Sequence, residues 1–244
     1  MLDERPRIVF VHGSVMGGRP TWSGQRGLRD RFRLEILERP GFPPNPPVDH
    51  VDFEEHALLV ADSIGDGAHL VGHSYGGVIA LLTAAAVPRS VRSLTVIEPP
   101  ATRLARGNPA ADVFTAEGIE WWATGPTHDP EAFLRGFLGY VGSDYVPPSP
   151  LPDHLQQGAR TLIVERGPWE AQIPLDALAA APFPKLVVSG GHHAGFDAVC
   201  DVLVERLGAG RLVLPGYGHM PHRHPDFNEA LAEFVTEAET VGRG

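Results

Sequence analysis

The segment Gly72-His73-Ser74-Tyr75-Gly76-Gly77 decides the fold class of this chain. It follows a short apolar run, His69 to Val71, and precedes a longer one, Val78 to Val87, which Pro88 ends. This order predicts a strand, a sharp turn and a helix. A serine in so sharp a turn needs glycine neighbours, because larger side chains would clash with the folded-back backbone. The segment therefore predicts a turn that presents the hydroxyl of Ser74 at its tip.

Other apolar runs indicate buried strands of the same sheet. Each is short, rich in Val, Ile and Leu, and stopped by glycine, proline or a charged residue. They are Arg7 to His12, Leu94 to Ile97, Leu186 to Ser189 and Leu212 to Leu214, with a weaker run at Leu34 to Leu37 before a proline-rich surface loop at 40–47. Between them, Asp52-Phe53-Glu54-Glu55 begins a helix that runs to Ile64. Strands that alternate with helices predict an α/β fold with a mostly parallel, doubly wound sheet.

The pattern changes between Pro100 and Pro184, where helical pieces rich in aromatic residues are broken by Gly and Pro. We interpret residues 100–184 as a helical cap, or lid, inserted after the strand that ends at Ile97, and residues 1–99 and 185–244 as one catalytic core. An aromatic cap suggests a largely apolar substrate, although such residues also serve packing. Candidates for the substrate pocket are His12, His73, Trp121, Trp122, Trp169 and His193.

Composition limits the classes of partner. Of the 244 residues, 43% are hydrophobic and 20% are charged, which is typical of a folded globular enzyme. The formal net charge of −10 argues against nucleic acid as a partner, and a single cysteine, Cys200, excludes an internal disulfide. Since neither a signal-peptide pattern nor a membrane-spanning apolar run is present, we expect a cytoplasmic protein that does not enter the membrane and acts on a small molecule.

Two sequence features supply the chemistry that Ser74 requires. A serine hydroxyl is a poor nucleophile until a base with a pKa near neutrality removes its proton, and His219 lies between Gly218 and Met220 after the last strand, where it can reach the turn. Amides at the N-terminus of a helix and at the end of a neighbouring strand can stabilise an oxyanion. We therefore expect the backbone amides of Tyr75 and Ser14 to form an oxyanion hole.

Other interpretations of these motifs are weaker. The turn at Ser74 carries neither G-x-G-x-x-G nor G-x-x-x-x-G-K-[ST], so a nucleotide site is not favoured. The histidines at 192, 193, 219, 222 and 224 resemble a metal cluster, but no H-E-x-x-H motif accompanies them, and we expect neither a catalytic metal nor a cofactor. His222 and His224 are expected to be surface residues.

Taken in order, His12-Gly13, the turn around Ser74 and Gly218-His219 resemble the α/β-hydrolase superfamily across nearly the whole chain. The resemblance implies a sheet of about six strands and esterase, lipase, lactonase or related acyl-transfer chemistry without a cofactor. It also implies a triad acid in the order nucleophile, acid, histidine.

The position of the acid departs from the family pattern. Many members carry it in a G-x-x-[DE] pattern after the cap, but here Gly191 is followed by His192, His193 and Ala194. Two substitutes remain. Glu98, directly after the strand next to the nucleophile strand, resembles a variant seen in certain dehalogenases and lactonases, and Asp197 can instead serve as an early acid of the following helix. We favour Glu98.

These features predict a serine hydrolase that cleaves a carboxylic ester or lactone of a small, largely apolar substrate through an acyl-enzyme on Ser74. Two alternatives use the same pocket: a ligand sensor that retains the triad, and a lyase or cyclase that uses the histidine as a base. The sequence leaves the oligomeric state open.

Overall fold

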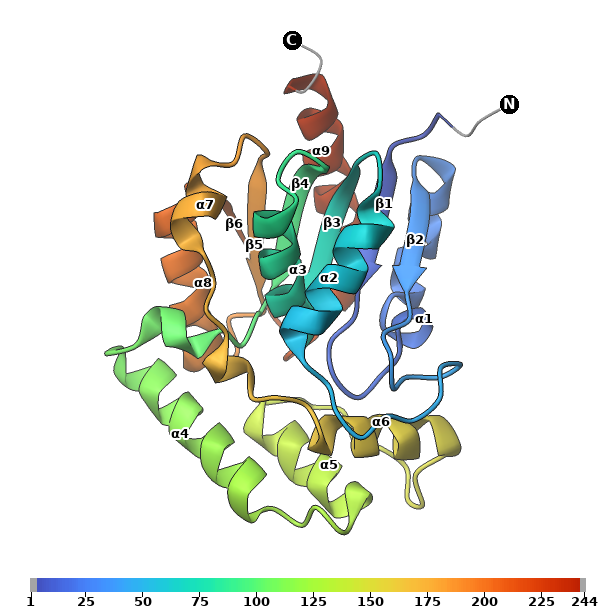
Figure 1. Ribbon diagram of the computed structural model, residues 1–244, viewed down its shortest axis with the longest axis vertical. Helices are drawn as coiled ribbons and strands as arrows, with labels where there is room; N and C mark the ends of the chain where they lie inside the picture. Colours follow the sequence, from blue (N-terminus) through green and yellow to red (C-terminus); the bar gives the residue numbers. More distant parts are fainter. Residues whose placement is uncertain (1–3, 242–244) are drawn as a thin grey trace.

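The computed structural model describes residues 4–241, and its centre is a six-stranded sheet in which all paired strands are parallel (Figure 1). The strand order is β2-β1-β3-β4-β5-β6. The predicted α/β class and number of strands are thereby confirmed. The strands are β1 (Arg7–Val11), β2 (Arg33–Leu37), β3 (Ala68–His73), β4 (Val91–Ile97), β5 (Lys185–Ser189) and β6 (Gly210–Val213).

Helices cover both faces of the sheet, as alternating strands and helices predict. The apolar side chains of one face, such as Val9 and Leu70, pack against one set of helices, whereas Phe10 and Val71 point to the other set. This alternation of successive side chains follows from the period of two in a strand. The first set is α2 (Phe53–Ile64), α3 (Tyr75–Ala86), α7 (Leu175–Ala180) and α8 (Ala194–Leu207); the second is the 3-10 helix η1 (Ser23–Asp30) and α9 (Phe227–Val241), with the short α1 (Gly18–Thr21) beside η1 and β2.

Helix α2 begins where its sequence predicts. The carboxylate of Asp52 accepts a hydrogen bond from the amide of Glu54 at 2.7 Å, and Gly65 follows the last helical residue, Ile64. Such a cap satisfies one of the amides that the first turn leaves without a helical partner.

Residues 102–170, between β4 and β5, form helices that lie across the end of the sheet toward which the strands run (Figure 1). They have an aromatic core of their own, which includes Phe133, Phe137 and Phe114 and which also contacts Val15 and Phe196 of the sheet-bearing part. This end of the sheet is therefore covered. The elements are η2 (Thr102–Ala105), α4 (Pro109–Thr124), α5 (Pro130–Tyr140), α6 (Asp153–Ile163) and η3 (Pro168–Glu170).

Across residues 4–241, no helix combines the length and the apolar character that a membrane crossing requires.

Candidate active site

Ser74 lies at the turn between β3 and α3 with a positive φ of 54°. A Cβ on Gly72 would come within 2.3 Å of the carbonyl oxygen of Gly76, and one on Gly76 within 2.4 Å of the carbonyl oxygens of Val11 and His12. Real Cβ contacts are never this close, so both positions require glycine. The two glycines allow the backbone to fold tightly enough to hold a non-glycine residue, Ser74, in the left-handed region.

Three side chains from different elements form a hydrogen-bonded line at this turn. The Oγ of Ser74 lies 2.9 Å from Nε2 of His219, and Nδ1 of His219 lies 2.6 Å from Oε2 of Glu98. All three residues are buried, with exposed fractions of 6%, 7% and 0%. In this geometry His219 can accept the serine proton on one ring nitrogen while a carboxylate orients the other.

Glu98 follows the last residue of β4 and has a φ of 45°, which turns its side chain toward His219. Its second oxygen accepts a hydrogen bond from the amide of Gly190 at 2.6 Å. Burial alone would raise the pKa of Glu98, but its contacts with His192, His219 and the Gly190 amide outweigh burial and hold the pKa well below its usual range. Glu98 is therefore ionised at neutral pH.

The alternative acid, Asp197, lies in the first turn of α8 and has other partners. Its Oδ1 accepts hydrogen bonds from Ser189 at 2.8 Å and from Arg211 at 3.0 Å. These contacts connect α8 to β5 and β6. The structure brings Glu98, rather than Asp197, to the histidine.

The loop that carries the expected oxyanion donor Ser14 is fixed by a buried ion pair. The guanidinium of Arg39 donates to the carbonyl oxygen of Gly13 at 2.9 Å and to Glu165 at 3.0 Å, and the hydroxyl of Ser14 donates to the same carboxylate. A Cβ on Gly13 would lie 2.8 Å from the Cβ of Ser74, so this loop packs directly on Ser74. No motif in the sequence indicates the Arg39–Glu165 pair, whose members are 126 residues apart.

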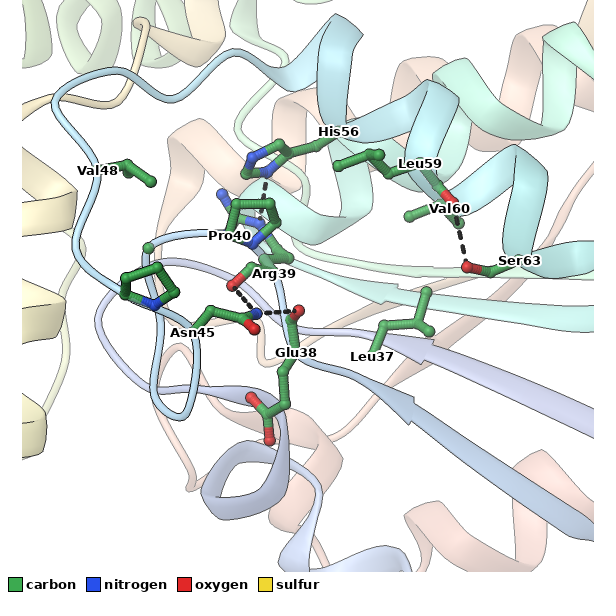
Figure 2. A pocket seen from close by; sticks show the side chains of 12 residues that line it. Leu37, Glu38, Arg39, Pro40, Asn45, Val48, His56, Leu59, Val60 and Ser63 are labelled. Atoms are coloured by element: carbon green, nitrogen blue, oxygen red, sulfur yellow. Dashed lines mark hydrogen bonds between the residues drawn. The ribbon is translucent and has the colours of Figure 1, made fainter.

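A separate cavity of about 380 Å³ lies on the other side of Arg39, between β2, the proline-rich loop and α2. Figure 2 shows His56 at its wall, joined to the Arg39 side chain, and Asn45 joined to the backbone of Glu38 and Arg39. The cavity contains none of the three residues of the Ser74 line. Through these bonds His56 and Asn45 help to hold Arg39 in place.

Two smaller cavities flank Ser74, with volumes of about 50 Å³ and 20 Å³. Ser14, Ser74, Phe137 and Val141 line both of them. The larger cavity, which we call the histidine-side cavity, is also lined by His219, His73, Met16, Tyr145 and Met220. The smaller one, the aromatic cavity, is also lined by Phe114, Trp122, Tyr140, Trp169, Phe196 and Glu165.

The six pocket candidates divide into two groups. His73 lines the histidine-side cavity, and Trp122 and Trp169 line the aromatic cavity. The other three lie outside both cavities. The ring of His12 is hydrogen-bonded to the backbone of Gly13 and Arg39. Trp121 packs on Gly136 and Phe133, and His193 accepts a hydrogen bond from the Gly195 amide at the start of α8.

The expectation that His222 is a surface residue is wrong. Its side chain is 1% exposed and packs against Trp22, His73 and Phe227. It lies in the 3-10 helix η4 (Pro221–Arg223) beneath the His219 loop, where burial keeps its pKa well below the usual range. A short polar loop gives no periodic signal that could have predicted this burial.

Buried neutral histidines make the fold sensitive to acid. Burial lowers the pKa of His56 and His73 to about 3 and that of His69 to about 4. Below pH 6.5 the unfolded chain therefore binds protons that the folded protein does not, and the free energy of unfolding falls as the pH falls. From pH 7 to pH 6 we expect each of these three histidines to lower the free energy of unfolding by about 0.7 kcal/mol, which is about 2 kcal/mol for the three together.

Urea unfolding at the two pH values measures this loss. In His69→Gln the loss should be smaller by about 0.7 kcal/mol, the share of that one histidine. A free energy of unfolding that stays constant or rises from pH 7 to pH 6 would contradict the assignment of these histidines as neutral.

Three side chains place atoms that could bind a metal ion within 4.8 Å of one another: Glu98, His192 and His219. A metal site would need the same geometry. His219 and Glu98, however, already share a hydrogen bond of 2.6 Å, and Glu98 also accepts from Gly190. We interpret the group as a charge cluster in which both histidines contact one carboxylate.

Comparison with known proteins gives both a family and structural neighbours. Residues 8–230 match the family described as the alpha/beta hydrolase family. A pimeloyl-[acyl-carrier protein] methyl ester esterase of Methylococcus capsulatus is 37% identical over 93 residues, which are 38% of this chain and only 36% of that protein.

Two solved structures share the fold. A membrane phospholipase A described as a bacterial virulence factor superposes with a TM-score of 0.71 and 23% identity, covering 97% of this chain and 80% of that one. The carboxylesterase CesB of Bacillus subtilis superposes with a TM-score of 0.66 and 17% identity, covering 96% and 85%.

Proposed function

The chain belongs to the alpha/beta hydrolase family, and we propose that it is a serine hydrolase that cleaves a carboxylic ester or lactone through an acyl-enzyme on Ser74. The observation that carries the proposal is the continuous line from Ser74 through His219 to Glu98, with distances of 2.9 Å and 2.6 Å. The matching methyl ester esterase supports the same class of reaction, although the match spans only a part of that protein.

In this mechanism Ser74 Oγ attacks the carbonyl carbon while its proton passes to Nε2 of His219. Glu98 stabilises the imidazolium through Nδ1. The negative charge on the former carbonyl oxygen is held by the amides of Ser14 and Tyr75, the latter in the first turn of α3, where amides have no helical partner. Collapse of this intermediate breaks the bond to the alcohol oxygen, which takes the proton from His219.

The second half of the reaction repeats these steps with water. His219 removes a proton from water, the hydroxide attacks the acyl-enzyme carbonyl, and Ser74 leaves with a proton from His219. For a lactone the alcohol is part of the same molecule, so one hydroxy acid leaves.

The two cavities suggest how the substrate is oriented. The leaving oxygen must lie within reach of Nε2 of His219, so the alcohol belongs in the histidine-side cavity, which His219 lines. The acyl group then occupies the aromatic cavity, whose volume of about 20 Å³ is close to that of a single small group. We therefore infer a short acyl group, and a cap role for residues 100–184, which supply Phe114, Trp122 and Trp169 to this cavity.

A substrate panel tests the proposal. We expect p-nitrophenyl acetate to be cleaved with a higher kcat/KM than the hexanoate or octanoate ester, with small lactones assayed beside them. A ligand sensor, or a lyase or cyclase, would instead leave every ester and lactone in the panel intact while the protein remains folded.

The preference for a short acyl group should depend on Trp122. Replacing it in Trp122→Leu enlarges the aromatic cavity, and we expect the ratio of kcat/KM for hexanoate to that for acetate to rise about tenfold. Trp121→Leu is the matched control, because this neighbour lies outside the cavity. An equal change in both variants, or none in Trp122→Leu, would contradict the assignment of the acyl site.

A further inference from the structure

A second histidine contacts the triad carboxylate. His192 lies on the loop after β5, where the family pattern places an acid, and its Nδ1 is 3.2 Å from Oε1 of Glu98. Its other ring nitrogen, Nε2, is 3.1 Å from the carbonyl oxygen of Val141, the residue after α5. The His192 side chain is only 15% exposed. The ring therefore connects the triad acid to the helical segment that covers the site.

Both ring nitrogens of His192 face acceptors. A neutral imidazole carries one N–H, whereas the imidazolium carries two and can donate on both sides. The approach of Nδ1 to Glu98 is an ion-pair contact rather than an aligned hydrogen bond, so its strength depends on the charge of the ring. Burial lowers the pKa of His192, but Glu98 and the Val141 carbonyl outweigh burial, and the net shift is upward.

We propose that His192 is a positioning residue that, in its protonated form, shares Glu98 with His219 and thereby controls the proton balance of the triad. This inference rests on the proposed function, since it concerns the same Ser74 site. Each histidine contacts a different oxygen of one carboxylate: His219 contacts Oε2 and His192 contacts Oε1. The two histidines are therefore coupled, with ring centres 6.1 Å apart.

Several side chains besides Glu98 and His219 lie around the His192 ring. Phe196 of α8 and His193, the residue before this helix, also face the His192 ring, and Asp197 of α8 adds negative charge at a longer range. Asp144, on the loop after α5, lies beside Gly218. Of these groups, only Glu98 contacts the His192 ring through a charged atom, so it dominates the charge balance.

The consequence for activity has a definite sign. A positive charge on His192 disfavours a second positive charge on His219, because both rings contact the same carboxylate. At higher pH His192 loses its proton, and the full charge of Glu98 becomes available to stabilise the His219 imidazolium. The acidic limb of the pH profile should therefore contain two ionisations.

The first test is the pH dependence of kcat/KM for His192→Gln on the best ester of the panel. We expect the acidic limb of the variant to show a single ionisation, with a midpoint about one pH unit above the first wild-type step. At pH values below that midpoint, the activity relative to the plateau should be about tenfold lower in the variant than in the wild type. His128→Gln, on the exposed turn before α5, is the matched control and should keep the wild-type profile. A uniform loss of rate with an unchanged profile would overturn the inference.

The second test does not depend on activity. In an NMR titration of the histidine rings, His192 of the wild type should titrate above the ordinary value of about 6.5, and in Glu98→Gln it should titrate below it. If no ester is cleaved, the proposed function fails and this titration alone decides the inference. If esters are cleaved but the titration of His192 is the same in Glu98→Gln as in the wild type, the inference fails while the proposed function stands.

Discussion

Ser74→Ala is expected to lower kcat/KM by about 10⁴- to 10⁶-fold. The variant lacks the oxygen that attacks the substrate, so only the oxyanion hole and binding remain to assist direct attack by water. The fold should persist, because the positive φ of 54° at this position depends on the glycines around it and alanine differs from serine by one oxygen. The measurement is kcat/KM on the best short-chain ester, together with a thermal melt.

Ser23→Ala provides the matched control for this variant. Ser23 is exposed at the start of η1 and its hydroxyl bonds only to the carbonyl of Pro20 among the described residues, so its loss should leave kcat/KM within about twofold of the wild type. If folded Ser74→Ala kept more than a tenth of wild-type activity, Ser74 would not be the nucleophile.

Glu98→Gln should produce the second-largest loss, about 10³- to 10⁴-fold in kcat. The substitution keeps the shape of the side chain but removes the charge that stabilises the imidazolium 2.6 Å away. It also allows the amide to donate toward Nδ1, which favours the wrong tautomer of His219. We expect kcat to fall while KM changes little, because the charge acts mainly in the transition state.

Asp197→Asn is the matched control, since it removes a carboxylate charge of the same kind from α8. Asp197 bonds to Ser189 and Arg211, so we expect a small loss of stability, about 1 kcal/mol, and a kcat within about threefold of the wild type. The reverse outcome, with Asp197→Asn inactive and Glu98→Gln active, would move the triad acid to Asp197.

Much of the fold was predictable because its signals are local. The buried strands are short β-branched runs, and α2 carries its own cap in Asp52, so each element could be recognised from a few adjacent residues. Errors at the ends are small: β1 ends at Val11 rather than His12, and α3 begins at Tyr75 rather than Val78. The parallel arrangement of the strands then follows from the alternation of strands and helices, because the connecting helices pack on both faces of such a sheet.

The position of Glu98 was also accessible from the sequence, since a carboxylate directly after a central strand has little freedom to point elsewhere. The contact of His192 with this carboxylate was not accessible. It depends on β5 lying next to β4 in register, with Ile97 paired with Val188, and on α5 ending beside the β5 loop. Such contacts join distant segments and leave no periodic pattern.

Burial of polar residues was the other property that sequence patterns did not reveal. His222, Arg39 and Glu165 are all nearly inaccessible, although residues of these types are usually exposed. Arg39 and Glu165 are compensated by each other, and this compensation becomes visible only when the loop after β2 meets the segment after α6.

The most direct test of the central proposal is the reaction of the folded protein with a fluorophosphonate probe, followed by intact mass and peptide mapping. The proposal predicts one adduct, on the peptide that contains Ser74, which is absent in Ser74→Ala and forms far more slowly in Glu98→Gln. A folded wild-type protein that acquires no adduct, or acquires it on a different residue, would contradict the assignment of Ser74 as the nucleophile.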